Sequence, residues 1–133
     1  MILGVDYGRK RIGLAILHGD GLVLPLTTIQ QVSRKDSLVR IGRYVAEFEC
    51  RQVIVGLPAN ADASKGTSAQ AAERFAEELR QTLSVTVELH DERLSSFEAR
   101  ERMRDLPRAR APVQDDALAA CVILESWWQQ HKG

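Results

Sequence analysis

The first sixteen residues place an acidic side chain at the end of a buried strand. Residues 2–5 form an apolar run, Asp6 follows directly, and a second apolar run covers residues 12–16. Strands at the centre of a sheet bury both faces, so they read as nearly continuous apolar segments. An ionised Asp in that position loses on the order of several kcal/mol of hydration unless something compensates its charge.

The connection between the two apolar runs carries positive charge. Gly8 permits a tight turn, and Arg9, Lys10 and Arg11 follow it. Two interpretations of this stretch stay open. Either a cation sits at Asp6 with a polyanion alongside, or Asp6 simply ends a strand at a solvated turn.

Length and composition predict one domain spanning residues 1–133. The chain is 44% hydrophobic and 27% charged, as is usual for a globular protein, and its formal net charge is zero. A nucleic-acid site must therefore come from local clusters of the 18 Lys and Arg residues. Cys50 and Cys121 are not spaced like metal ligands, and we expect them to be reduced.

The sequence also favours a cytoplasmic location. The first strand starts at the N-terminus without the charged region of a signal peptide. The longest apolar run, residues 117–124, is much shorter than the roughly 20 residues of a membrane helix.

Three strands are expected first, over residues 1–6, 11–18 and 22–29. The turn signal Gly19-Asp20-Gly21 predicts an antiparallel hairpin between the second and the third. Pro25 cannot donate a ladder hydrogen bond, so the third strand should lie at an edge or carry a bulge.

Helices and strands then alternate, which predicts a mixed α/β sheet of three antiparallel strands followed by two parallel ones, flanked by helices. Ser33 and Asp36 resemble a capping box that starts a helix, and Ser95 and Glu98 form a full one. The remaining elements are a strand at 53–56, a helix starting at Thr67 or Ser68, a strand at 85–89, a basic loop at 105–114 and a last helix at 115–130.

Acidic residues occur at element ends that this topology can bring together. Asp6 ends the first strand, Asp91 and Glu92 end the fifth, and Asp116 begins the last helix on its apolar side. Carboxylates with room for water are the ligands that Mg²⁺ or Mn²⁺ prefers. Two such ions roughly 3.5–4 Å apart can activate water for phosphodiester hydrolysis.

Each acid also has a purely structural interpretation. Asp115 and Asp116 suit the first turn of a helix, and Asp91 could cap a turn or pair with Arg93. The sequence does not decide between Asp91 and Glu92, and we expect Glu125 to lie at the surface.

A second signal is the polar loop at residues 57–66. The helix start that follows it, together with Lys65, could bind an anion, or the segment could be an ordinary surface loop. It does not match the nucleotide P-loop pattern. Of the histidines, only His90 lies beside the predicted acids; we expect His18 and His131 at the surface.

With these motifs assembled, the chain resembles the YqgF (RuvX) family of pre-16S rRNA nucleases and Holliday junction resolvase-like proteins. The resemblance covers essentially the whole chain. It rests on residues 6–15 (DYGRKRIGLA), 55–60 (VGLPAN), 91–96 (DERLSS) and on Asp116 with its following small and apolar residues. Ala63 departs from the family pattern, where relatives usually have Gly.

The resemblance implies a ribonuclease H-like fold and a cytoplasmic, Mg²⁺- or Mn²⁺-dependent nuclease of ribosome biogenesis that matures the 5′ end of 16S rRNA. It implies catalytic and metal-binding roles for Asp6, Glu92 and Asp116, with Asp91 beside the metal. The residues expected to hold RNA, or single-stranded or branched DNA, are Arg9, Lys10, Arg11, Asn60, Ser64, Lys65, Arg93, Arg108 and Arg110.

Other functions stay open. One is a Holliday junction resolvase-like DNA nuclease, which should be a dimer, and another is a non-catalytic nucleic-acid-binding factor of ribosome assembly. A sugar- or acetate-kinase-like phosphotransferase also opens with an Asp-x-Gly turn, but such enzymes close two domains around ATP. The sequence leaves a monomer and a homodimer equally open.

Overall fold

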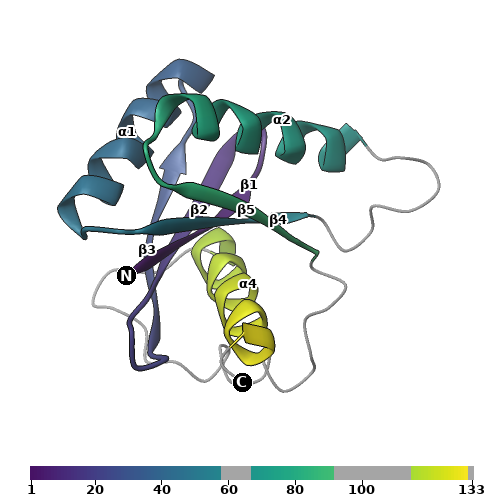
Figure 1. The fold of residues 1–133 in the computed structure, drawn as a ribbon. Helices are drawn as coiled ribbons and strands as arrows, with labels where there is room; N and C mark the ends of the chain where they lie inside the picture. The colour runs from purple at the N-terminus through teal and green to yellow at the C-terminus, as the bar shows by residue number, and fades with distance from the viewer. Residues whose placement is uncertain (58–66, 92–114, 132–133) are drawn as a thin grey trace.

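The computed structural model describes residues 1–57, 67–91 and 115–131 (Figure 1). These residues form five strands and three helices. In chain order they are β1 (Ile2–Tyr7), β2 (Arg11–Leu17), β3 (Val23–Gln30), α1 (Arg34–Glu47), β4 (Gln52–Leu57), α2 (Thr67–Thr82), β5 (Thr86–Asp91) and α4 (Asp115–His131). The capping box at Ser95 and the basic loop at 105–114 lie outside the described residues.

The strands form one mixed sheet in the order β3-β2-β1-β4-β5. β1 pairs antiparallel with β2, and β2 antiparallel with β3. β4 pairs parallel with β1 on its other side, and β5 continues the parallel half. The predicted fold class is confirmed, because the sheet consists of three antiparallel strands followed by two parallel ones.

Pro25 has both of the consequences expected of it. β3 is an edge strand, and the register of β2 against β3 shifts between Leu14 and Ala15, where Thr27 and Pro25 are the partners. The extra residue in β3 is a bulge at the position where proline cannot donate to the ladder.

The sheet lies between two layers of helix. Figure 1 shows α1 and α2 on one face and α4 on the other. Val5, Ile41 and Phe75 belong to the core on the α1/α2 side, whereas Ile54 and Leu124 belong to the core on the α4 side. Among the described residues, no helix is long and apolar enough to cross a membrane.

Helix α4 packs unusually close to the sheet at two glycines. A Cβ atom at Gly4 of β1 would lie 2.5 Å from Cγ of Leu124, and one at Gly13 of β2 would lie 1.8 Å from the backbone oxygen of Asp116. Side chains alternate between faces along a strand, and both glycines are on the α4 face. The absence of side chains there sets how near the start of α4 can come to β1 and β2.

Replacement of Gly13 by alanine tests this close approach. Gly13→Ala is expected to destabilise the protein by roughly 3 kcal/mol, at the upper end of overpacking costs, because the clash is with backbone rather than with a flexible side chain. Urea unfolding at equilibrium measures the change.

Gly19→Ala is the matched control, because a Cβ atom at Gly19 would meet nothing within 4 Å. Its expected effect on the free energy of unfolding is within about 0.5 kcal/mol. Equal destabilisation by the two substitutions would contradict the assignment of Gly13 to the β2–α4 contact.

Candidate active site

Asp6 is the acidic residue of β1 on the α4 face of the sheet. Leu3 and Val5 are buried in the core under α1 and α2, and Ile2 in the core under α4. Alternation therefore puts Asp6 on the α4 side. It is partly buried, and its pKa is raised from 3.8 to about 6, first by desolvation and second by the charge of Asp116.

Asp116 reaches Asp6 through the packing of α4 on β2. Gly13, which lies under the backbone oxygen of Asp116, is the cross-strand partner of Asp6. The structure thus brings together two of the predicted acids, which are 110 positions apart in the sequence (116 − 6). Their mutual repulsion contributes to the raised pKa of Asp6.

Arg11 partly compensates this negative charge. Its Nε donates a hydrogen bond to Oδ2 of Asp116 at 2.8 Å, with side chains 49% and 27% exposed respectively. An ion pair that is this exposed contributes little to stability. The ion pair instead fixes the position of the Asp116 carboxylate, next to the first residue of β2.

Asp91 falls on the opposite face from Asp6. Val87 is buried in the core under α1 and α2 and Leu89 packs against it, whereas His90 Nε2 lies 2.8 Å from Ser126 Oγ of α4. Alternation along β5 assigns Asp91 to the α1/α2 side. Glu92 lies outside the described residues, and within the described ranges no group of three or more His, Cys, Asp or Glu could hold a metal ion.

The predicted nucleic-acid contacts divide into two sets. Arg9 and Lys10 are exposed at the turn between β1 and β2, and Arg11 pairs with Asp116. The other set lies outside the described residues and comprises Asn60, Ser64, Lys65, Arg93, Arg108 and Arg110.

The expectation that Glu125 lies at the surface is wrong. Glu125 is 2% exposed, and Gln129 Nε2 donates to its Oε1 at 3.3 Å. His90 is also buried, and its pKa is lowered, first by desolvation and then by the charge of His131. His90 therefore serves as a neutral partner of Ser126 between β5 and α4.

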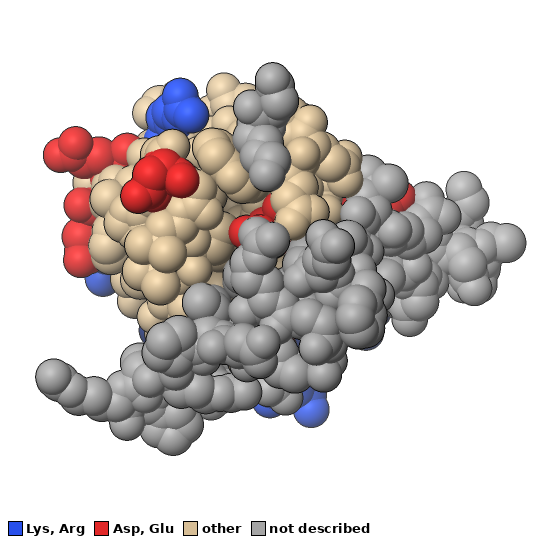
Figure 2. Space-filling model, turned by 90° about the horizontal axis from the view of Figure 1, so that it is seen from below, with Lys and Arg blue, Asp and Glu red and all other residues tan. Residues whose placement is uncertain are grey.

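Seen from below, the described surface of the molecule is mostly uncharged (Figure 2). Acidic side chains lie at its left margin and on the face itself, and Lys or Arg side chains lie at its upper and lower edges. On this face, the negative charge of the Asp6–Asp116 pair is offset within the described residues chiefly by Arg11.

The pair suits a divalent cation. Its donors are carboxylate oxygens, the ligands that Mg²⁺ and Mn²⁺ prefer, and both burial and repulsion disfavour two negative charges in this position. Sequence reasoning found both acids but missed Gly4 and Gly13, which place them. The available signal was glycine inside an otherwise apolar strand, which often marks close approach of another backbone.

Solved structures place the fold in a known class. RuvC from Thermus thermophilus, in complex with a Holliday junction substrate, has a TM-score of 0.57 at 18% identity and covers 97% of this chain and 94% of its own. A "putative sugar kinase" from Cytophaga hutchinsonii has a TM-score of 0.51 at 14% identity, over 76% of this chain and 38% of its own. At these identities the likeness shows the fold alone: an α/β domain of the ribonuclease H-like class.

Sequence comparison is more specific. The family model described as "RuvX: Holliday junction resolvase" matches residues 1–130. A Myxococcus xanthus protein named "Putative pre-16S rRNA nuclease" is 41% identical over 133 residues, covering 98% of this chain and 88% of the relative. A relative of the same name from Anaeromyxobacter sp. strain Fw109-5 is 45% identical over 129 residues, or 94% and 93% of the two chains. This chain belongs to the RuvX family of nucleases, as the resemblance of its motifs predicted.

The raised pKa of Asp6 predicts how stability depends on pH in the absence of divalent metal. The folded protein holds a proton on Asp6 up to about pH 6, whereas the ordinary pKa is 3.8. Between these values the folded state binds more protons than the unfolded chain, so stability falls as pH rises through this window. The expected loss is up to about 3 kcal/mol.

Asp6→Asn should remove this dependence and make the metal-free protein more stable than the wild type at about pH 8. Urea unfolding of both proteins across the pH range measures it. Glu73→Gln, at an exposed acid on α2, is the control and should keep the wild-type profile. Parallel profiles for wild type and Asp6→Asn would refute the burial of charge at Asp6.

Proposed function

We propose that this protein is a Mg²⁺- or Mn²⁺-dependent nuclease that hydrolyses phosphodiester bonds in RNA and processes the 5′ end of pre-16S rRNA in the cytoplasm. The observation that carries the proposal is the juxtaposition of Asp6 and Asp116 across β1, β2 and α4. Membership of the RuvX family supports nuclease chemistry, and the names of the relatives support the choice of RNA.

The proposed catalytic carboxylates are Asp6, Asp116 and Glu92. We choose Glu92 over Asp91 as the third ligand because alternation along β5 puts Asp91 on the α1/α2 side. Glu92 is the acid that the family motif implies as a ligand, and it lies outside the described residues. Asp91 then becomes a residue beside the centre rather than a ligand.

A divalent ion held by these carboxylates would neutralise phosphoryl charge and lower the pKa of the attacking water. The chain's own residues supply the rest of the chemistry. Asp6 and Asp116 orient the reacting groups. Arg11 holds the Asp116 carboxylate in place through its Nε, 2.8 Å from Oδ2. Water adds across one P–O bond, so one fragment keeps the phosphate and the other a hydroxyl.

Basic residues near this centre would hold the strand by its phosphates. Arg9 and Lys10 follow Gly8 in the turn after β1, and we assign the same role to the basic residues outside the described ranges. Contacts of this kind position a strand without reading its sequence, and they weaken as salt rises.

Cleavage of structured RNA is the direct test. Asp6→Asn is expected to reduce the rate with Mn²⁺ by roughly 100-fold or more, the magnitude typical of losing a group that stabilises transition-state charge. Gel analysis of end-labelled RNA measures the rate. Glu73→Gln should cleave at the wild-type rate, and equal cleavage by wild type and Asp6→Asn would reject the proposal.

A second candidate function is resolution of four-way DNA junctions, which the description of the matching family favours. A resolvase presents two active sites to one junction and is therefore a dimer. The same assay with a four-way junction, together with the mass of the protein in solution, separates the two substrates. Cleavage of the junction by a dimer, without cleavage of RNA, would favour the resolvase.

Metal uptake can be measured without activity. Mn²⁺ should raise the thermal midpoint of the wild type, because a ligand at 100 times its dissociation constant stabilises by about 2.7 kcal/mol. Asp6→Asn should show little or no such rise, whereas Glu73→Gln should behave like the wild type. A rise of the same size in Asp6→Asn would place the metal elsewhere, and no rise in any of the proteins would favour a non-catalytic binding factor.

A further inference from the structure

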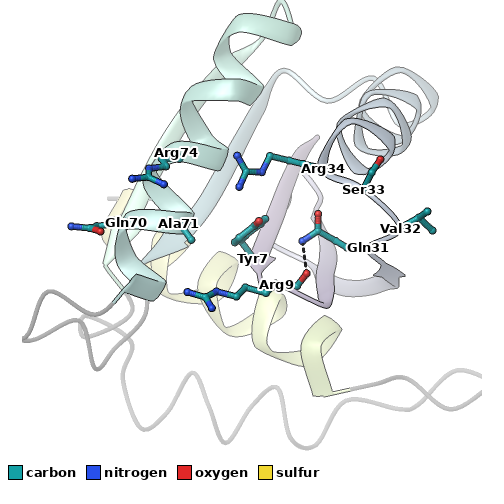
Figure 3. Close-up of a pocket in the computed structure, with 9 residues that line it drawn as sticks. All are labelled: Tyr7, Arg9, Gln31, Val32, Ser33, Arg34, Gln70, Ala71 and Arg74. Atoms are coloured by element: carbon teal, nitrogen blue, oxygen red, sulfur yellow. Dashed lines mark hydrogen bonds between the residues drawn. The ribbon is translucent and has the colours of Figure 1, made fainter.

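A concave site lies at the end of β1, on the face opposite Asp6. The cavity has a volume of about 560 Å³ between the β1–β2 turn, the start of α1 and the first half of α2 (Figure 3). In Figure 3, Tyr7 lies between the Arg9 and Arg34 side chains. The lining residues are Tyr7, Arg9, Gln31, Val32, Ser33, Arg34, Gln70, Ala71 and Arg74.

The described residues that line this pocket carry only positive charge. Three of them are arginines and none is acidic. Arg34 Nη1 forms an ion pair with Glu78 Oε2 at 3.0 Å, just outside the lining. Within the described ranges neither Arg9 nor Arg74 has an ion pair, so two guanidinium groups stand available in a protein with no net charge.

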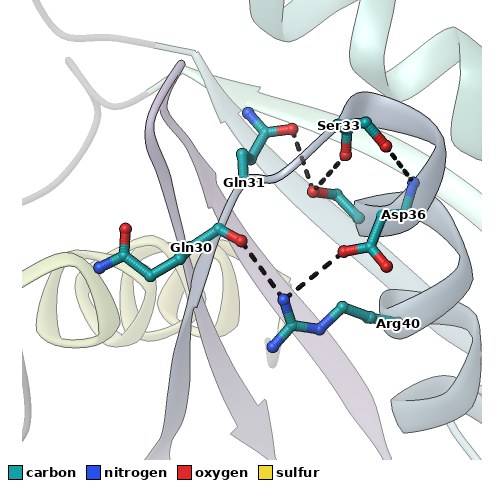
Figure 4. Close-up of polar contacts among 6 residues, drawn as sticks. Gln30, Gln31, Ser33, Asp36 and Arg40 are labelled. Atoms are coloured by element: carbon teal, nitrogen blue, oxygen red, sulfur yellow. Dashed lines mark hydrogen bonds and ion pairs between the residues drawn. The ribbon is translucent and has the colours of Figure 1, made fainter.

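The pocket is held in shape by hydrogen bonds among its own segments. Gln31 Nε2 donates to the backbone oxygens of Gly8 at 2.7 Å and of Arg9 at 3.0 Å, which ties the β1–β2 turn to the start of α1. Ser33 Oγ caps α1 by accepting from Asp36 N at 3.0 Å, and the fully buried Ser37 places its Oγ 3.0 Å from Gln31 Oε1 (Figure 4).

On the other wall, Tyr7 stacks on Phe75 of α2, with ring centroids 4.5 Å apart. This contact fixes the floor of the pocket against α2, on which Gln70 and Arg74 are one helical turn apart. The guanidinium groups are therefore mounted on a turn and two helices that are connected to one another. The backbone segments that carry them therefore need little rearrangement when a ligand binds.

The chemistry of the lining selects a phosphate ligand. Guanidinium groups bind phosphate through paired N–H donors, and the amide of Gln70 and the hydroxyl of Ser33 add neutral hydrogen-bonding groups. A volume in the roughly 300–1,000 Å³ range of ligand pockets has room for a sugar and a base as well as the phosphate.

We propose that this pocket binds one nucleotide unit of the substrate strand, through its phosphate, next to the bond cleaved at Asp6 and Asp116. This inference rests on the proposed function. Tyr7 follows Asp6 in β1, so their Cα atoms are about 3.8 Å apart while their side chains point to opposite faces. A strand that crosses the end of β1 can thus reach both the pocket and the carboxylate pair.

Binding of a short single-stranded RNA, followed by fluorescence anisotropy in EDTA, tests the pocket. Arg74→Gln is expected to weaken binding about tenfold. It should also lower the slope of log affinity against log salt by about 0.7, the value for one phosphate contact to a single strand. Arg74 is exposed, so the substitution should leave the thermal midpoint unchanged. Arg74→Lys should keep the slope and lose part of the affinity, because it retains the charge but not the paired donors.

Arg43→Gln is the matched control. Arg43 is an exposed arginine of α1 outside the pocket, and its replacement should change neither affinity nor slope. Unchanged binding in Arg74→Gln, or equal losses in Arg74→Gln and Arg43→Gln, would overturn the proposal.

Competition identifies the source of the phosphate. AMP and inorganic phosphate should displace the RNA only weakly if the pocket serves a strand. Binding of AMP as tight as that of the RNA, and lost in Arg74→Gln, would assign the pocket to a free nucleotide and overturn the strand proposal.

The test is independent of cleavage because it uses no metal. If Asp6→Asn cleaves normally while Arg74→Gln binds poorly, the assigned catalytic centre fails and the pocket stands. If Asp6→Asn loses cleavage while Arg74→Gln binds like the wild type, the pocket fails and the nuclease assignment stands.

Discussion

The approach of α4 to the sheet is the constraint on which the candidate active site depends. Asp116 comes beside Asp6 because the backbone at the start of α4 lies directly over Gly13, the cross-strand partner of Asp6. Gly4 makes the same room further along, beneath Leu124. A side chain at either position would push the helix outward, so these two glycines determine the distance between the acids.

Placing the two carboxylates close together costs folding free energy, so the arrangement is better explained by a function than by stability. Burial and the charge of Asp116 both disfavour ionised Asp6, and Arg11 offsets only part of that charge. A neutral pair of the same shape would fold more easily. Sites that hold like charges close together are commonly functional, because a bound cation or substrate supplies the missing compensation.

Local sequence patterns predicted the sheet well and the faces of its strands less well. Pro25 predicted the edge strand and its bulge, and Ser33 predicted the cap of α1, because both effects depend on neighbouring residues alone. Alternation along β5 puts Asp91 on the same face of the sheet as Val87 and Leu89. The sequence does not show which helices cover that face. Glu125 was misjudged because residues 123–127 are all buried, which is wider than the single apolar stripe that periodicity detects.

The arginine pocket shows a different limit of sequence reasoning. Its walls come from residues 7–9, 31–34 and 70–74, and no local pattern links these segments. Tertiary packing brings them together through Gln31 and through the stack of Tyr7 on Phe75. Adjacent residues at the end of β1 thus belong to two different sites. Asp6 belongs to the carboxylate pair on the α4 face, and Tyr7 belongs to the arginine-lined pocket on the α1/α2 face. A polyanion at this edge would meet positive charge on one side and, on the other, acids that need a cation.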